Sequence, residues 1–212
     1  MRETTATARK SAYVPGEDLS GSPVLLHICC APCATYPVQR LRELGYVLTG
    51  YWFNPNVHPW LEHEARRKSL IHYAAKVGLP VQWEPGYHIL GFLRQVAGAE
   101  ERPHRCLVCY AMRLSRAAAA ARRLGIPCFT TTLLVSPYQD QDLIREAGER
   151  AAREQDVEFY FENFRRGWSE RSRLTRHFDL YRQQYCGCVF SEFERYTGTS
   201  IAAASEIHLE DR

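Results

Sequence analysis

Short apolar runs alternate with longer amphipathic stretches along most of this chain. The run at 24–28 is almost wholly apolar, which is typical of a parallel strand buried on both faces. The stretch at 35–44 places apolar residues at helical spacing and stops at Gly45, a common helix terminator. The same patterns predict further strands at 46–53, 79–83, 126–134 and 157–161, and further helices at 60–77, 88–97, 107–124, 140–155 and 170–184.

Strands that alternate with helices of this length are joined by right-handed crossovers. The pattern therefore predicts an α/β fold in which a parallel, Rossmann-like sheet is the middle of three layers. The chain then ends in a C-terminal helical segment, 170–184, that runs into the CxC motif Cys186-Gly187-Cys188. Ligand sites of such sheets lie beyond the carboxyl ends of the strands, so the loop after the first strand is expected to line the site.

The two ends of the chain lack this periodicity. Residues 1–22 are rich in small and polar residues and are predicted to be a mobile N-terminal extension. Residues 23–200 are predicted to form a single α/β domain that binds metal and carries the catalytic site, and 201–212 to form a C-terminal tail. No apolar stretch is long enough to span a membrane and no signal-peptide pattern occurs, so we expect a cytoplasmic protein without a membrane partner.

Composition adds the cysteines to this picture. The 212 residues are 45% hydrophobic and 24% charged, which excludes disorder throughout the chain. Eight cysteines are too few for a disulfide-stapled scaffold, yet they cluster. In a reducing cytoplasm, paired cysteines indicate metal binding or redox chemistry. The net charge of +3 conceals two arginine-rich segments, 102–123 and 165–182.

Two groups of cysteines have the spacing of metal ligands. Cys29, Cys30 and Cys33 follow the first predicted strand, where the dipole of the next helix favours thiolates. Cys106 and Cys109 form a CxxC motif at the start of a predicted helix, so both sulfur atoms lie on one face. Four thiolates can hold either zinc or a [4Fe-4S] cluster. The adjacent Cys29 and Cys30 favour the cluster, because neighbouring residues reach two corners of a cluster more easily than one small ion.

The CxC motif has a different character. A pair so close in sequence can close into a strained disulfide, and strained, exposed disulfides are typical of catalytic or regulatory sites. A third pair of metal ligands and two unreactive thiols are the alternatives. Cys128 lies alone in an apolar run and is predicted to be a core residue.

Five segments in order form a more specific pattern than any single cysteine pair. They are LLHICCAPC (25–33), NPNVHP (54–59), RCLVCYAMRL (105–114), TTLLVSPYQ (131–139) and LYRQQYCGC (180–188). In these segments, which span nearly all of the predicted domain, the sequence resembles the epoxyqueuosine reductase QueH family. The resemblance implies a fold related to the PP-loop and HUP nucleotide-binding proteins.

The resemblance also implies an activity. It is the reduction of the epoxide of epoxyqueuosine to the cyclopentene of queuosine, at the wobble position of tRNAs with GUN anticodons, as the last step of queuosine biosynthesis. It implies a [4Fe-4S] cluster and a redox-active thiol pair. An external electron donor would supply the electrons to this site. The positions that match the cluster ligands are Cys29, Cys30, Cys106 and Cys109, and those that match the redox-active pair are Cys186 and Cys188. Cys33 is then a fifth clustered thiol, and it could bind a second metal ion, iron, beside the cluster.

Removal of an epoxide oxygen needs two electrons, an acid on the oxygen, and protons that leave as water. The candidate acids and substrate-binding groups are His27, Asn54, His58, Tyr138 and Asp140. The candidate contacts to tRNA phosphates are Arg105, Arg113, Arg165 and Arg166. Each of these residues has a structural alternative as a helix cap, a loop residue or a solvated surface group.

Two other functions fit part of the pattern. A zinc-stabilised RNA-binding protein would use thiolates from both cysteine groups as structural ligands. A cluster-dependent tRNA thiolase of the PP-loop type would share fold and cofactor, but it needs a phosphate loop for ATP. No SGGxDS-like loop follows the first predicted strand, where cysteines stand instead.

Overall fold

The computed structural model describes residues 21–206, and its centre is a five-stranded sheet. The strands are β1 (Pro23–His27), β2 (Val47–Trp52), β3 (Val81–Trp83), β4 (Cys128–Thr131) and β5 (Glu158–Phe159). They are ordered β3-β2-β1-β4-β5, and every neighbouring pair is parallel. The predicted α/β class with a parallel, Rossmann-like sheet is confirmed. Residues 1–20 of the predicted extension and 207–212 of the predicted tail lie outside the described residues.

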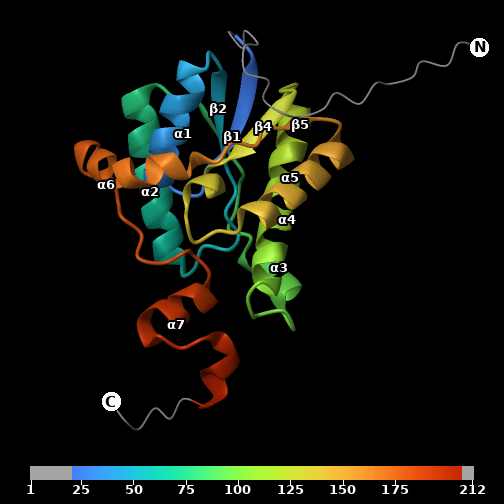
Figure 1. Cartoon of the computed structure of the whole chain (residues 1–212), viewed down its shortest axis with the longest axis vertical. Helices are drawn as coiled ribbons and strands as arrows, with labels where there is room; N and C mark the ends of the chain where they lie inside the picture. Colours follow the sequence, from blue (N-terminus) through green and yellow to red (C-terminus); the bar gives the residue numbers. More distant parts are fainter. Residues whose placement is uncertain (1–20, 207–212) are drawn as a thin grey trace, which may run out of the picture.

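Helices cover both faces of the sheet (Figure 1). On one side lie α1 (Ala31–Glu43), α2 (Trp60–Val77) and α6 (Trp168–His177), and on the other α4 (His104–Arg123) and α5 (Gln141–Gln155). Helix α3 (Ile89–Val96) packs on α4, and α7 (Val189–Thr197) lies beyond the carboxyl end of the sheet. The 3-10 segments are η1 (Thr132–Val135), η2 (Phe164–Gly167) and η3 (Ile201–Glu206).

Strand β1 owes its central place to its apolar sequence. Val24, Leu25 and Leu26 are fully buried, and β1 pairs with β2 on one edge and with β4 on the other. A strand that is paired on both edges and covered on both faces has to be apolar along its length. The order of strands reverses between β1 and β4, so the carboxyl ends of these two border the crevice where sheets of this kind bind ligands.

The strand predicted at 126–134 is wrong in its second half, because β4 ends at Thr131. The Thr131 hydroxyl accepts a hydrogen bond from the Leu133 N–H, which caps η1 and turns the chain out of the sheet. Buried apolar residues such as Leu133 and Leu134 suit a short helix as well as a strand, so the pattern alone did not mark the change. The turn places Thr132 beside the loop after β1, where its hydroxyl accepts from the Cys29 N–H at 3.0 Å.

The helix predicted at 170–184 is also wrong in its second half. Helix α6 ends at His177, and Asp179 takes a left-handed conformation with φ of 53°. The following residues are irregular and lead into α7, a helix that the sequence pattern did not predict. The CxC motif therefore lies in a loop rather than at the end of a helix, and Cys188 is the N-cap of α7.

Candidate active site

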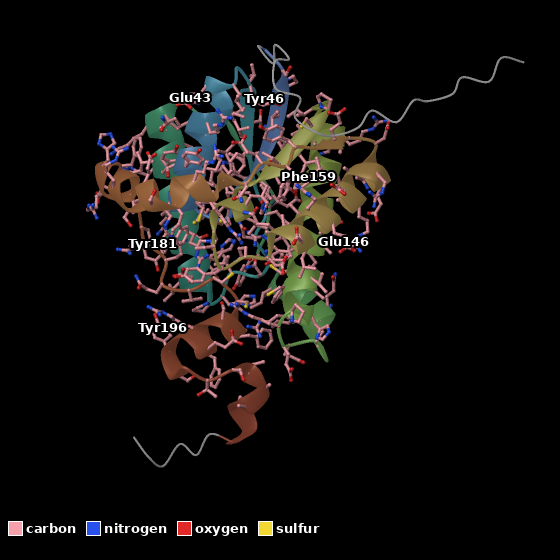
Figure 2. All side chains as sticks on the ribbon, viewed as in Figure 1. Glu43, Tyr46, Glu146, Phe159, Tyr181 and Tyr196 are labelled. Carbon is pink, nitrogen blue, oxygen red and sulfur yellow. The ribbon has the colours of Figure 1, made fainter. Side chains whose placement is uncertain are left out.

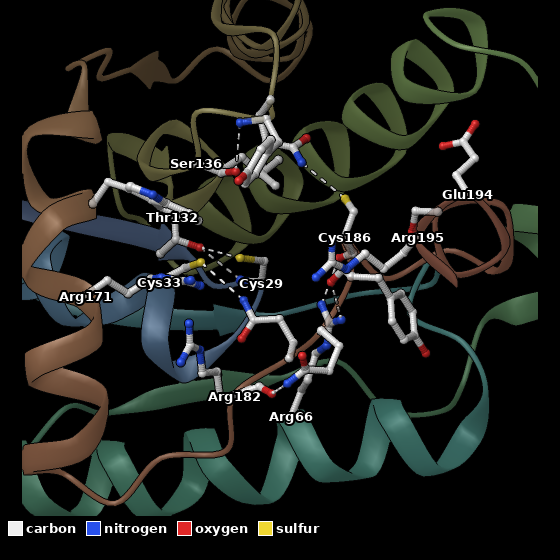
Figure 3. Close-up of a pocket in the computed structure, with 18 of the residues that line it drawn as sticks. Cys29, Cys33, Arg66, Thr132, Ser136, Arg171, Arg182, Cys186, Glu194 and Arg195 are labelled. Atoms are coloured by element: carbon white, nitrogen blue, oxygen red, sulfur yellow. Dashed lines mark hydrogen bonds between the residues drawn. The ribbon is translucent and has the colours of Figure 1, made fainter. Parts of the chain in front are cut away.

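A cavity of about 670 Å³ opens beyond the carboxyl ends of β1 and β4 (Figure 3). Its walls come from the loop after β1, from η1 and the loop behind it, from α6, and from the chain between α6 and α7. Three cysteines line it: Cys29, Cys33 and Cys186. Sulfur atoms, drawn in yellow, lie between the sheet and α7 (Figure 2). The loop that the sequence predicted to line the site thus meets the CxC motif in space.

The first thiol group consists of Cys29, Cys30 and Cys33, at the turn from β1 into α1. Their sulfur atoms lie within 4.8 Å of one another, close enough to hold a metal together. The Thr132 hydroxyl donates to the Cys29 sulfur at 3.2 Å, and the Gln183 amide donates to the Cys30 sulfur at 3.0 Å. Hydrogen bonds donated to sulfur stabilise a thiolate more than a thiol, so both partners favour the metal-binding form.

Contacts among these three thiols give them different pKa values. Hydrogen bonds from Cys30 and Cys33 hold the pKa of Cys29 well below its usual range. Burial and the neighbouring Cys29 raise the pKa of Cys30 to about 12. Hydrogen bonds to Cys29 and Cys30 raise the pKa of Cys33 well above its usual range. The Cys29 thiol is therefore the most acidic of the three, and a metal bound by all three sulfurs would displace their protons.

The second thiol group consists of Cys106 and Cys109 on α4 with Cys186 and Cys188 of the CxC motif. Cys109 and Cys188 belong to one small apolar cluster formed by α3, α4 and α7. Burial raises the pKa of Cys106 to about 11 and that of Cys109 to about 12, and the nearby Cys186 acts in the same direction on both. Within residues 21–206, no set of three mutually close ligand atoms includes Cys106 or Cys109. Of the four predicted cluster ligands, only Cys29 and Cys30 share such a set.

Arg113 links the two thiol groups. Its Nη1 donates to the Cys109 sulfur at 3.7 Å, and its charge lowers the pKa of Cys29. Its Nη2 donates to Asn54 Oδ1 at 2.7 Å, while Asn54 Nδ2 donates to the Ile28 carbonyl at 2.9 Å. The guanidinium is buried, so thiols and an amide oxygen surround it instead of water. A buried cation beside both groups favours thiolates in each.

The two cysteines of the CxC motif have different surroundings. Cys186 is exposed at the cavity and receives a hydrogen bond from Gln139 Nε2 at 3.2 Å. Cys188 is buried, and its sulfur accepts from the Ser191 N–H at 3.4 Å, which caps α7. Gly187 between them has φ of 147°, in the region that favours glycine. The motif therefore pairs an accessible free thiol with a protected one.

Among the five predicted acids and substrate groups, Tyr138 alone lines the cavity. Its side chain is 74% exposed, and its ring meets Trp168 edge to face with centroids 5.8 Å apart. Asp140 instead accepts hydrogen bonds from the N–H groups of Asp142 and Leu143. Asp140 is thus the N-cap of α5, which is the structural alternative considered for it.

His27 and His58 are buried histidines. His27 Nδ1 meets the Thr131 hydroxyl at 2.8 Å, and burial together with the Arg113 charge lowers the pKa of His27 to about 3. His58 Nε2 donates to the Pro55 carbonyl at 3.0 Å, and burial lowers the pKa of His58. Burial therefore favours the neutral form of both rings, which hold the loops around the site together.

The four arginines predicted to contact phosphates lie in different surroundings. Arg105 and Arg113 are each only 2% exposed, and the Arg105 guanidinium pairs with Glu194. Arg165 donates to the Gln139 carbonyl at 2.7 Å, and Arg166 lies on a separate pocket. Besides Arg113, the arginines that line the cavity are Arg66, Arg102, Arg171, Arg182 and Arg195.

Three residues that donate hydrogen bonds to sulfur were not predicted: Thr132, Gln139 and Gln183. All three lie in the segments 131–139 and 180–188, and this membership was the only signal that could have indicated them. Threonine and glutamine are common in loops for many reasons, so their role becomes visible only when the sulfur atoms are in place.

These observations define a class of protein: an α/β protein whose thiol-lined cavity, at the switch point of a parallel sheet, is suited to metal and redox chemistry. A family model described as "Epoxyqueuosine reductase QueH" matches residues 24–194. The chain belongs to this family.

Relatives named epoxyqueuosine reductase QueH match most of the chain. The protein of Dehalococcoides mccartyi is 39% identical over 174 residues, which covers 82% of this chain and 94% of the relative. The protein of Thermotoga maritima is 35% identical over 181 residues, with 81% and 91% covered. The protein of Haemophilus influenzae is 36% identical over 174 residues, with 79% and 71% covered.

Membership of the family makes the chain an oxidoreductase of queuosine biosynthesis. The described helices include none that is both long enough and apolar enough to cross a membrane.

Proposed function

We propose that this protein reduces epoxyqueuosine to queuosine at the wobble position of tRNAs with GUN anticodons, in the cytoplasm, as the last step of queuosine biosynthesis. The observation that supports this most is that Cys29 of the first thiol group and Cys186 of the CxC motif line one cavity. The names of the relatives supply the substrate. Removal of the epoxide oxygen to leave an alkene needs an acid, two electrons and two protons at one place, and a metal site beside a thiol pair can provide them.

We assign a [4Fe-4S] cluster to Cys29, Cys30, Cys106 and Cys109. The donor set fits, because all four are free thiols and the buried Arg113 cation touches one group and acts on the other. When bound, such a cluster would relay electrons, and an iron ion beside it with an open coordination position would polarise an oxygen. Cys33 lies within 4.8 Å of two of these sulfurs and is assigned to a second metal ion, iron.

We assign the supply of the electron pair to Cys186 and Cys188. In the overall reaction both carbon–oxygen bonds of the epoxide break, a carbon–carbon double bond forms, and the oxygen leaves as water. The two thiols lose two electrons and two protons and become one disulfide, so atoms and electrons balance. An external reductant then restores the dithiol. The exposed Cys186 can approach the substrate, while the buried Cys188 is kept for closing the disulfide.

Charge and aromatic surface at the cavity support an RNA substrate. The Arg171 guanidinium stacks over Trp168 at 4.0 Å, and Tyr138 lies beside the same ring. Arginines bind phosphates by charge and by paired hydrogen bonds, and aromatic rings stack unpaired bases. We assign the anticodon loop to this side of the cavity. We assign the phosphate contacts to cavity-lining arginines in place of Arg105, Arg113, Arg165 and Arg166; they are Arg102, Arg171, Arg182 and Arg195.

Nucleoside analysis of tRNA from a strain that lacks this protein tests the proposed function. In a strain with no other epoxyqueuosine reductase, we expect epoxyqueuosine to accumulate and queuosine to disappear, because no other step would then remove the epoxide oxygen. Return of the gene on a plasmid should restore queuosine. Normal queuosine in the deletion strain, with no other reductase present, would reject the proposal.

Substitution of Tyr138 separates stacking from proton donation. We expect Tyr138→Ala to raise KM for the tRNA about tenfold, because one base–aromatic stack is lost, and Tyr138→Phe to keep KM near the wild-type value. Tyr196→Ala is the matched control, since Tyr196 is 62% exposed and lies outside the cavity. A Tyr138→Phe variant with a strongly lowered kcat would show that the hydroxyl donates a proton instead.

A further inference from the structure

A buried arginine of α2 binds the backbone next to the exposed thiol. Arg66 is 1% exposed, and its Nε donates to Glu62 Oε1 at 2.7 Å, one helical turn earlier. Its Nη1 donates to the Cys186 carbonyl at 2.8 Å, and its Nη2 donates to the Tyr185 carbonyl at 3.0 Å. The planar fork is thus divided between one carboxylate and two consecutive carbonyl groups.

The same stretch of backbone is held at a third carbonyl. The His58 N–H donates to the Gly187 carbonyl at 2.8 Å, and the Tyr185 hydroxyl donates back to the His58 carbonyl. The carbonyl groups of residues 185–187 are therefore all bound by His58 and Arg66. Figure 3 shows the sulfur of Cys186 directed away from Arg66 and toward the other side of the cavity, where Gln139 donates to it.

We propose that Arg66 is a positioning residue for the thiol pair. By holding the carbonyls of Tyr185 and Cys186, it keeps the CxC turn in the conformation from which the Cys186–Cys188 disulfide closes. This inference rests on the proposed function, in which these two thiols form the redox pair. Arg66 acts through the backbone of Cys186 and is not assigned any contact with the reacting atoms.

The contact between α2 and the segment 180–188 is built along one helix face. Glu62, Arg66 and Ser69 are spaced i, i+4 and i+7, so they lie in one row on α2. Glu62 receives a hydrogen bond from the Tyr181 hydroxyl, and Ser69 Oγ accepts from the Tyr181 N–H at 3.1 Å. Arg66 is the member of the row that reaches the CxC motif.

Packing alone does not require a charge at this position. A buried ion pair is costly to desolvate, and apolar side chains of similar volume often serve stability equally well. What an apolar side chain cannot do is bind two consecutive carbonyl groups in a fixed plane. We therefore attribute the choice of arginine to the conformation of the turn that it holds.

Gly187 allows the close approach that this contact needs. A Cβ added at Gly187 would lie 3.3 Å from Arg66 Nη1 and 3.2 Å from Val57 Cγ2, on a backbone whose φ already favours glycine. A larger residue at position 187 would therefore crowd the Arg66 guanidinium.

The equilibrium between dithiol and disulfide measures this role directly. In a glutathione buffer, the thiols of Cys186 and Cys188 each lose one hydrogen atom, a disulfide forms, and one glutathione disulfide becomes two glutathione molecules. Trypsin cleaves after Arg182 and Arg195, so the peptide 183–195 contains these two cysteines and no other. Alkylation of the free thiols followed by mass spectrometry of this peptide gives the fraction oxidised in the full-length, metal-loaded protein.

Two substitutions carry the test. Arg66→Met removes the charge and the fork, while Arg66→Lys keeps a charge but cannot bind two carbonyls in one plane. We expect both to disfavour the disulfide by about tenfold or more, and to lower kcat with KM unchanged, because charged hydrogen bonds that fix the turn are lost. Iron content should stay at the wild-type level. Arg67→Met is the matched control, since Arg67 pairs with Glu64 and does not line the cavity.

If Arg66→Lys has the same dithiol–disulfide equilibrium as the wild type, the inference is overturned. This variant tests the inference even if Arg66→Met fails to fold. Equal losses of iron and of disulfide would also overturn it, because Arg66 would then serve the fold of the whole site. A wild-type protein that turns over without ever forming the disulfide would instead contradict the thiol-pair part of the proposed function, and the role of Arg66 with it.

Discussion

Serine in place of Cys186 is expected to lower turnover by about a thousandfold or more while the metal content stays at the wild-type level. Cys186 is the exposed thiol of the CxC motif and lines the cavity, whereas Cys188 is buried as the cap of α7. A hydroxyl cannot form a disulfide, so the electron pair cannot leave the motif. A single-turnover assay on epoxyqueuosine-containing tRNA, with iron and sulfide measured on the same sample, checks both parts.

Cys128→Ala is the matched control for this experiment. Cys128 lies on β4, packs against the main core and does not line the cavity. We expect its removal to leave turnover unchanged. Retained turnover in Cys186→Ser would remove the thiol pair from the mechanism, and lost iron in the same variant would show that Cys186 serves the metal instead.

Serine in place of Cys30 or Cys109 is expected to cost the protein its iron. Thiolates are the soft ligands that iron–sulfur clusters require, and a serine hydroxyl replaces them poorly. The wild-type protein, purified without oxygen, should be brown, absorb at about 400 nm and carry about four irons in its cluster. Each variant should lose this absorbance. The two residues belong to the first and the second thiol group, so the experiment asks whether both groups hold one cluster.

Cys33→Ser makes the same experiment more selective. The sulfur of Cys33 lies within 4.8 Å of the sulfurs of Cys29 and Cys30. With the cluster on the assigned ligands, Cys33→Ser should keep the absorbance and lose the additional iron alone. If Cys33→Ser loses the cluster and Cys109→Ser keeps it, the first thiol group holds the metal without α4. A colourless wild-type protein that contains only zinc would contradict the cluster itself and support the structural zinc alternative.

The layered fold and the place of the first cysteines could be predicted from local patterns. An almost wholly apolar run at 24–28 indicated a strand buried on both faces, and the helix at 60–77 was predicted with the bounds that α2 has. Right-handed crossovers then put the loop with Cys29 at the carboxyl edge of the sheet. These conclusions hold because burial, helical period and crossover handedness are properties of short stretches of chain.

Local patterns were insufficient where a segment is shaped by a distant partner. The helix predicted at 170–184 ends at His177, the last residue of α6. The chain after it runs along α2, and side chains of α2 bind the backbone of that segment. Arg66 and Cys186 are 120 positions apart, and nothing in either segment indicates their contact. Periodicity assigned the helix at 60–77 and the row of residues on its face. What packs against that row, and therefore how the thiol pair is held, was decided by the tertiary structure, because the carbonyl groups of 185–187 acquire their partners only when the chain has folded.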